Sequence, residues 1–156
     1  MIGFGYDSHR LEKGIPFILG GVLIASDVGP VAHSDGDAVL HALCDALLGA
    51  ASLGDIGEYF PDSGPAFKNA DSSIFTRKVL SLIEEKLFKI INIDITIILE
   101  KPKLAEYKPE IKKNISSICN VSAEHVNIKA KTSEKMGFIG QGEGIAVFCV
   151  CQLEMR

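Results

Sequence analysis

One apolar stretch, residues 37–51, constrains the fold of this chain more than any other segment. Apolar residues would cover most of a helix there, and only Asp37, His41 and Asp45 interrupt them. At about 3.6 residues per turn, spacings of four and eight bring side chains back within about 40° and 80°, so these three share one stripe. A helix that is apolar nearly all round is normally buried, and buried ionisable groups are costly without partners. The sequence therefore predicts a core helix whose polar stripe meets a metal, opposite charges or a ligand. The alternative is a core histidine bonded to a neighbouring carboxylate.

The remaining pattern predicts a mixed β-sheet with helices packed against it, an α/β architecture of the α+β type in a single domain over residues 1–156. A glycine pair at 20–21, between two apolar triplets, is typical of a β-hairpin turn. Two strands joined by a short helix near the middle of the chain form a βαβ unit, whose strands should be parallel. Strands are predicted at residues 1–6, 17–19, 22–24, 93–99, 126–131 and 144–153, and helices at 37–51, 71–88 and 109–119.

Composition limits the class of protein. The 156 residues, 47% hydrophobic and 23% charged, suffice for one buried core. A formal charge of -4 without a basic run argues against a nucleic-acid surface, and no apolar run reaches the length of a membrane span. The four cysteines lie in apolar contexts without CxxC spacing, which favours reduced core thiols in a cytoplasmic protein. Any nucleotide partner should therefore be a small molecule.

Asp7 and His9 add a pair of candidate metal ligands. In an extended backbone, residues two apart face the same side, so a D-x-H pair at the end of the first strand can chelate one ion. The alternative is a turn-forming aspartate beside a surface histidine. With His41, the pair makes a set of one carboxylate and two imidazoles, the pattern of a zinc ion with an open position for water or substrate.

Two polar loops flank the apolar helix. Residues 33–37 precede it, and Ser34 or Asp35 should cap its free amide groups at a helix start that attracts anions. A glycine- and proline-rich loop at 54–65 follows the helix and carries two further aspartates. A loop of that length is often a binding edge or lid, although both aspartates could equally be turn formers.

A third loop, residues 129–138, mixes lysines, hydroxyl groups and one carboxylate. Lysine and hydroxyl donors suit phosphate oxygens, whereas Glu134 would repel a phosphate unless a divalent cation stood between them. This combination indicates metal-bridged phosphate binding. The alternative is a solvated surface loop of alternating charges.

At these motifs the chain resembles the 2-C-methyl-D-erythritol 2,4-cyclodiphosphate synthase family of the non-mevalonate isoprenoid pathway. The resemblance runs almost end to end, with the motifs in the same order and at compatible spacing. It rests on Asp7-Ser8-His9, on His33-Ser34-Asp35-Gly36-Asp37 with His41, and on Gly54-Asp55-Ile56-Gly57, Phe60-Pro61-Asp62, Pro102-Lys103, Lys129-Ala130, Glu134-Lys135-Met136-Gly137-Phe138 and Gly142-Glu143-Gly144.

The resemblance implies a homotrimeric lyase that converts 4-diphosphocytidyl-2-C-methyl-D-erythritol 2-phosphate into the cyclic diphosphate and CMP. The substrate's own 2-phosphate attacks its β-phosphorus, so the protein has to position groups and neutralise charge. The resemblance further implies zinc held by Asp7, His9 and His41, and a second divalent cation, Mg²⁺ or Mn²⁺, held by Glu134.

The resemblance also assigns the groups that touch substrate. His33 and Thr132 resemble the groups that stabilise the transition state, with Ser34 beside a substrate phosphate, while Asp55 and Gly57 would hold sugar hydroxyls. The expected substrate contacts are Asp7, Ser8, His9, His33, Ser34, Asp55, Ile56, Gly57, Phe60, Pro61, Asp62, Ser63, Gly64, Leu99, Glu100, Lys101, Pro102, Lys103, Leu104, Ala105, Lys131, Thr132, Ser133, Glu134, Phe138 and Gln141.

The implied active sites lie between subunits of the trimer. The zinc cluster and the loop at 55–62 would come from one subunit, and the cytosine-enclosing segment 99–105 with the loop 132–134 from its neighbour. The chain departs from the family pattern at Gln141, where relatives commonly carry an arginine associated with a central cavity for an isoprenoid diphosphate. Gly64 and Lys131 also depart from it, replacing an acidic residue and a threonine.

Two other function classes fit parts of the pattern. A zinc hydrolase would use metal-bound water, but the chain has no HExxH helix and no obvious general base paired with the metal. A metal-stabilised binding module would need a fourth, closing ligand, and it would release no CMP.

Overall fold

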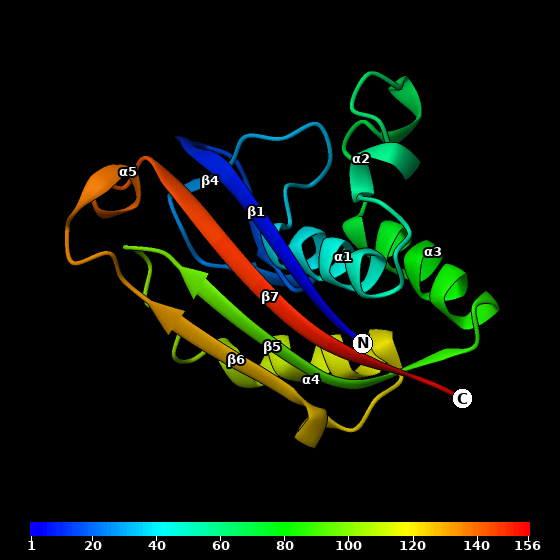
Figure 1. The fold of residues 1–156 in the computed structure, drawn as a ribbon. Coiled ribbons are helices and arrows are strands. Elements are labelled where there is room, and N and C mark those ends of the chain that lie inside the picture. Colours follow the sequence, from blue (N-terminus) through cyan, green and yellow to red (C-terminus); the bar gives the residue numbers. More distant parts are fainter.

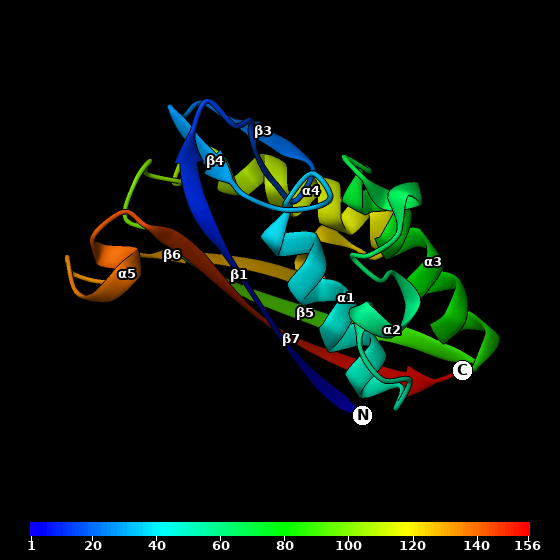
Figure 2. The same ribbon diagram turned by 90° about the horizontal axis from the view of Figure 1, so that it is seen from above.

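The computed structural model describes all 156 residues, and it confirms a mixed sheet with helices packed against one of its faces (Figure 1, Figure 2). Five strands form the sheet in the order β4-β1-β7-β5-β6, and β2 and β3 pair as a separate hairpin. The strands are β1 (Ile2–Lys13), β2 (Phe17–Leu19), β3 (Val22–Ile24), β4 (Val28–Pro30), β5 (Phe88–Ile98), β6 (Val126–Lys131) and β7 (Gly144–Met155). The helices are α1 (Ala38–Ala50), α2 (Ile56–Tyr59), α3 (Ser72–Glu85), α4 (Lys108–Cys119) and α5 (Gly137–Gly140).

Strand pairing confirms the predicted βαβ unit. β5 and β6 are parallel, with α4 between them in the chain, whereas β1, β4, β5 and β7 make only antiparallel pairs with one another. Alternate residues of the central strands point at the helices and are buried, as Ile95 of β5 and Val147 of β7 illustrate. The core therefore lies between the sheet and α1, α3 and α4.

Glycine at two positions of β1 lets α1 lie directly against the strand. A Cβ on Gly3 would fall 1.8 Å from the carbonyl oxygen of Ala46, and a Cβ on Gly5 would fall 1.9 Å from that of Ala42. Any side chain there would collide with helix backbone, so glycine on the strand and alanine on the helix set the distance between the two elements. This close contact brings the polar stripe of α1 next to the residues that follow Gly5.

Three predicted boundaries are wrong by three residues or more. β5 begins at Phe88 instead of residue 93, because Phe88–Ile90 already pair with β7. β1 continues to Lys13, because its pairing with β7 runs on to Arg10 and Leu11–Lys13 then pair with β4, so Asp7 and His9 lie within the strand rather than at its end. The second long helix ends at Glu85 instead of residue 88, because Leu87 adopts a left-handed backbone with φ of 62° before β5 begins.

The cysteines and the helices agree with two limits drawn from the sequence. All four cysteines are free and buried, as expected for core thiols. No helix combines the length and apolar character needed to cross a membrane. The face of the sheet opposite the helices is open, and it exposes Ile2, Phe4, Tyr6 and Val150.

Candidate metal centre and substrate cavities

The acids on the stripe of α1 have partners. Asp37 is fully buried and accepts hydrogen bonds from four backbone N–H groups, two in the β2–β3 turn and two in the first turn of α1. Asp37 therefore caps the helix, and the expectation that Ser34 or Asp35 would cap it is wrong, because the Asp35 carboxylate binds the first turn of α3 instead. Burial raises the pKa of Asp37 to about 6, although these amide groups act to lower it.

The second acid of the stripe, Asp45, lies one turn beyond His41. It accepts the N–H of Ile56 at 2.8 Å and so holds the start of α2.

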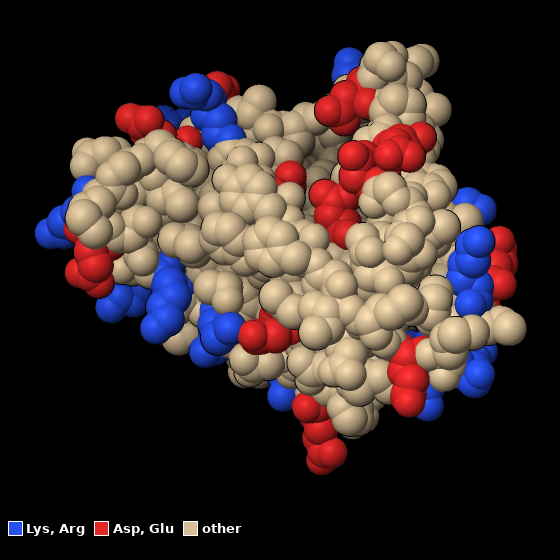
Figure 3. Space-filling view, in the orientation of Figure 1, with Lys and Arg blue, Asp and Glu red and all other residues tan.

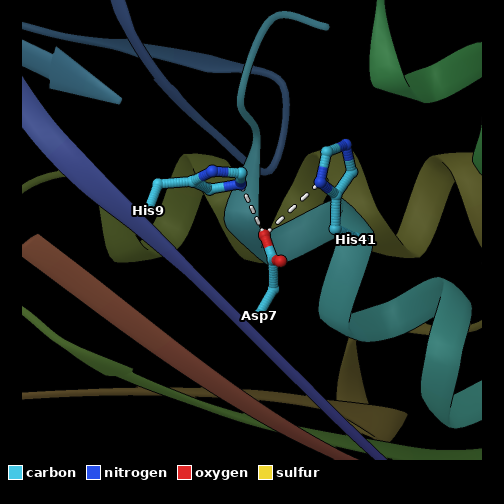
Figure 4. A group of neighbouring side chains, drawn as sticks. All are labelled: Asp7, His9 and His41. Carbon is cyan, nitrogen blue, oxygen red and sulfur yellow. Dashed lines mark ion pairs between the residues drawn. The ribbon is translucent and has the colours of Figure 1, made fainter. Parts of the chain in front are cut away.

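His41 faces β1, where it meets Asp7 and His9 (Figure 4). Asp7 Oδ2 lies 2.7 Å from His9 Nε2 and 3.3 Å from His41 Nδ1. One ligand atom from each residue lies within 4.8 Å of the other two. The D-x-H pair thus faces one side of the strand as predicted, and the three expected metal ligands come together.

The cluster leaves polar atoms without hydrogen bonds. Asp7 Oδ2 and His9 Nε2 are buried and 2.7 Å apart, but their geometry is not that of a hydrogen bond. Orphaned buried polar atoms are costly unless a further partner satisfies them. Ligand atoms around zinc, bound at about 2.0–2.2 Å, lie about 3.3 Å apart, so small side-chain shifts would admit an ion. The donor set therefore fits a divalent metal with at least one open position, since no fourth protein ligand joins the group.

The electrostatics of the cluster also favour a positive charge. Burial alone would raise the pKa of Asp7, but contacts with His41 and His9 outweigh it and hold the pKa below its ordinary value. Burial would likewise lower the pKa of His41, but the contact with Asp7 and the charges of Asp37 and Asp35 raise it. Both shifts show that the site favours a positive charge beside the Asp7 carboxylate. A bound metal ion would supply that charge in place of a proton on His41.

The cluster forms part of the wall of a cavity of about 640 Å³. The cavity opens between the sheet and the arm formed by α2 and the following loop, where acidic side chains gather (Figure 3). Four of its lining residues were not predicted from the sequence: Val31, Ala32, Phe67 and Phe75. The rings of Phe67 and Phe75 also pack against each other. The only sign of Phe75 in the sequence is that it precedes Val79 by four residues, a spacing that puts both side chains on the buried face of α3. The expected contacts that line the cavity are Asp7, Ser8, His9, His33, Ser34, Ile56, Gly57, Phe60, Pro61 and Asp62.

Three further expected contacts in the 54–65 loop do not line the cavity. Asp55 accepts the N–H of Glu58 at 3.2 Å and caps α2, which is the turn-forming role that the sequence left open. Gly64 accepts a hydrogen bond at 2.8 Å from His33 Nε2, which must carry the proton because a carbonyl can only accept. Ser63 is exposed in the same turn.

The expected cytosine segment borders a different cavity, of about 240 Å³. This second cavity shares no residue with the first, so His33 and Thr132 lie in different cavities of one chain. Of the segment 99–105, only Lys101 stays outside the lining. The residues that line this cavity are Leu99, Glu100, Pro102, Lys103, Leu104, Ala105, Lys108, Ala130, Lys131 and Thr132.

Glu100 holds the turn that carries Glu134, a role that the sequence did not indicate. Its two carboxylate oxygens accept the N–H groups of Ser133 at 3.0 Å and Lys135 at 3.1 Å. Glu134 and Lys135 have φ of 52° and 63°, in the left-handed region that costs a non-glycine residue about 1–2 kcal/mol. Thr132 Oγ1 lies 3.4 Å from Glu134 Oε1, so the two expected functional side chains of this loop are neighbours.

The last two expected contacts lie in neither cavity. Phe138 lines a third, smaller cavity of about 190 Å³ together with His9 and Arg10. Gln141 is exposed and donates to the carbonyl oxygen of Lys135 at 2.9 Å. The third cavity shares Ser8 and His9 with the first, so the expected substrate contacts of one chain divide mainly between the first and second cavities.

Comparisons with known proteins identify the family of the chain. The pattern of the YgbB family matches residues 1–154. A protein of Methylobacillus flagellatus, named 2-C-methyl-D-erythritol 2,4-cyclodiphosphate synthase, is 50% identical over 153 residues, which cover 98% of this chain and 96% of the relative.

Solved structures give the same result. A 2C-methyl-D-erythritol-2,4-cyclodiphosphate synthase in a CDP-bound form superposes with a TM-score of 0.91 at 38% identity, covering 99% of this chain and 100% of that one. The bifunctional IspDF from Campylobacter jejuni superposes with a TM-score of 0.96 at 42% identity, and the match covers 99% of this chain but 42% of that longer one. The chain therefore belongs to the YgbB family, alongside the 2-C-methyl-D-erythritol 2,4-cyclodiphosphate synthases that it matches from end to end.

Proposed function

We propose that the chain is a lyase of isoprenoid precursor biosynthesis that converts 4-diphosphocytidyl-2-C-methyl-D-erythritol 2-phosphate into 2-C-methyl-D-erythritol 2,4-cyclodiphosphate and CMP. One observation carries this function: the half-buried cluster of Asp7, His9 and His41 on the wall of an open cavity, in a chain 50% identical to a named synthase along its length. The cluster has no fourth closing ligand, as expected for a metal that meets substrate rather than one that holds a fold together.

The metals are proposed from the donor atoms. Asp7, His9 and His41 would hold zinc, which when bound supplies a Lewis acid to the phosphate that is attacked. Glu134 would hold Mg²⁺ or Mn²⁺. The hydroxyl and lysine donors of its turn suit a phosphate, and a divalent cation would be needed between that phosphate and the exposed Glu134 carboxylate. The chain's own work is to hold two phosphates in line and to offset their charge, since no protein nucleophile is required.

The substrate contacts are proposed from the two cavities. The first cavity would hold the reacting phosphates and the sugar, with His33 and Ser34 facing the phosphates. The second cavity would hold cytosine, since Leu99 and Leu104 provide apolar surface and Lys103 provides a cation at its rim. The CDP complex of a relative with the same fold supports a cytidine nucleotide as the ligand.

The division of the site between two cavities supports an assembly of copies. Zinc ligands and Glu134 must serve one substrate, yet the residues around them line separate cavities in one chain. The open face of the sheet supplies a surface for such an assembly, because Ile2 and Phe4 are 74% and 61% exposed there beside Tyr6. Uncharged surface covers the middle of this face (Figure 3). We therefore assign the face to further copies of this chain in a homotrimer, with each active site completed by a neighbour.

The proposed setting of this enzyme is the cytoplasm. All four cysteines are free and buried, which suits a reducing compartment. Neither nucleic acid nor a membrane is needed as a partner, since the substrate is a small molecule.

Release of CMP from the cytidyl substrate tests the function. Purified protein loaded with zinc should release CMP together with the cyclic diphosphate, and removal of Mg²⁺ and Mn²⁺ with retention of zinc should slow the release. His41→Ala is the matched loss of one ligand, and it should lose both zinc and turnover. Full CMP release by a zinc-free His41→Ala protein would show that the cluster has no part in the reaction.

A further inference from the structure

The two ring nitrogens of His41 face different partners. Nδ1 points to the metal cluster, 3.3 Å from Asp7 Oδ2. Nε2 points the other way and lies 2.8 Å from Ser72 Oγ, with Ser34 Oγ farther away at 3.3 Å. Only a ring nitrogen without a proton can bind a metal, so the proton on His41 has to reside on Nε2.

The partner of Ser72 decides where that proton resides. The Ser72 hydroxyl also contacts Asp35 Oδ1, and a carboxylate can only accept a hydrogen bond. A hydroxyl has one proton, so Ser72 donates it to Asp35 and has only lone pairs left for His41. Nε2 must then carry a proton and donate to Ser72. The Nδ1 lone pair is left free and directed at the metal position.

Asp35 and Ser72 are themselves firmly held. Ser72 is fully buried at the first position of α3. Asp35 Oδ2 accepts the backbone N–H of Ser72 at 3.0 Å, and Asp35 Oδ1 accepts the backbone N–H of Asp37 at 3.1 Å. The Asp35 carboxylate therefore cannot rotate away without breaking bonds on both sides.

A purely structural role accounts for part of this arrangement. Asp35 fastens the first turn of α3 through the Ser72 N–H, as a capping residue would. The N-cap of α3, however, is already Asp71, which accepts the N–H of Ser73 at 2.8 Å. Capping needs neither the Ser72 hydroxyl nor its contact with His41.

We propose that Asp35 and Ser72 are positioning residues that act in series on His41 and fix it with the proton on Nε2, so that Nδ1 is available to a divalent metal. This proposal rests on the metal site of the proposed function. Partners of this kind fix the tautomer and orientation of ligating histidines, and their loss typically reduces metal affinity about 10–100-fold.

Asp35→Asn tests the direction of the hydrogen bonds. The carboxamide keeps the shape of the side chain. With its oxygen on the Ser72 N–H, its NH₂ group would donate to Ser72 Oγ and would give up the bond from the Asp37 N–H. The hydroxyl proton would then turn toward His41 Nε2 and favour the tautomer with the proton on Nδ1. We expect zinc affinity, measured by competition with a chelator, to fall about 10–100-fold. Nitrogen NMR of labelled histidine in the metal-free protein, recorded where the ring is neutral, should show His41 protonated on Nε2 in the parent and on Nδ1 in the variant.

Asp71→Asn is the matched control. It changes a carboxylate at the same helix start to the same carboxamide, but Asp71 has no contact with His41. It should leave zinc affinity and the tautomer unchanged. Ser72→Ala provides a second test that does not depend on an asparagine, because it removes the hydroxyl and keeps the backbone N–H that Asp35 accepts. It should also weaken zinc binding.

The outcomes separate this proposal from the proposed function. Unchanged zinc affinity and an unchanged tautomer in folded Asp35→Asn protein would overturn the proposal, while CMP release by the parent could still stand. Equal loss of zinc affinity in Asp71→Asn would also overturn it, because the effect would then belong to the helix start. A parent chain that binds no zinc would refute the metal site itself, and with it the ligand role of Nδ1.

Discussion

Replacing Gly5 with alanine should force α1 away from β1. The added Cβ would lie 1.9 Å from the carbonyl oxygen of Ala42 and 2.7 Å from the backbone nitrogen of Ala46. Ordinary van der Waals contact begins near 3.4 Å, so strand and helix would have to separate by the difference, about 1.5 Å. Overpacking typically costs about 1–3 kcal/mol. Because the colliding atoms are backbone and cannot rotate away, we expect a loss at the upper end, about 3 kcal/mol of the free energy of unfolding.

The same shift should disturb the metal cluster. Ala42 is adjacent to His41, so moving this turn of α1 moves His41 relative to Asp7. A misplacement of about 1 Å can cost about 10²-fold in rate, so CMP release should fall as well. The assay is urea unfolding at one fixed protein concentration, with zinc content and CMP release measured on the folded variant.

Gly49→Ala is the control on the same pair of elements. A Cβ on Gly49 meets only the carbonyl oxygen of Phe4, at 3.9 Å, and alanine is favoured over glycine within a helix by about 0.5–1 kcal/mol. This variant should be more stable than the parent. If Gly5→Ala unfolds at the same urea concentration as the parent and keeps its zinc, the glycine contact does not set the position of α1.

Three further outcomes follow from the contacts. Asp37→Asn should lower the free energy of unfolding, measured by urea titration, by about 1–3 kcal/mol, because its NH₂ group would face backbone N–H donors. An unchanged urea midpoint would contradict the role of Asp37 as the cap of α1. The native thiols should resist a thiol reagent near neutral pH and react only after unfolding, since burial raises the pKa of Cys44 to about 12; rapid modification of native protein would contradict this. Glu100→Gln should weaken the dependence of CMP release on Mg²⁺ but leave zinc content intact, because it loosens the turn that carries Glu134; equal loss of zinc would contradict that separation.

The sequence predicts those features that depend on local pattern. The spacing of Asp37, His41 and Asp45 indicates a buried helix with a polar stripe, and the D-x-H spacing indicates a chelate, because both depend on the period of one element. The glycine pair between two apolar triplets predicts the hairpin for the same reason. These features needed no knowledge of the tertiary structure.

The missed features depend on contacts between distant segments. Asp35 binds α3 across 37 positions in the chain, and no spacing rule relates it to Ser72. The end of α3 depends on Leu87 in a left-handed backbone, which a leucine does not signal. The hydrogen bond from the Ser133 N–H to the Glu100 carboxylate joins two loops that α4 and β6 separate in the chain. Nor does the sequence show whether two cavities on one chain serve one substrate.

Mixing two inactive variants tests most directly whether copies of the chain share each active site. His41→Ala destroys the zinc half and Glu134→Gln the second-metal half, so neither protein alone should release CMP at the parent rate. In a closed ring of three copies, every mixed trimer would contain one site in which an intact zinc cluster meets an intact Glu134. Refolding the two variants together should restore about one third of the parent rate per mixed trimer, whose composition mass measurement confirms. Mixed trimers that stay as inactive as either variant alone would show that one chain supplies both halves of the site.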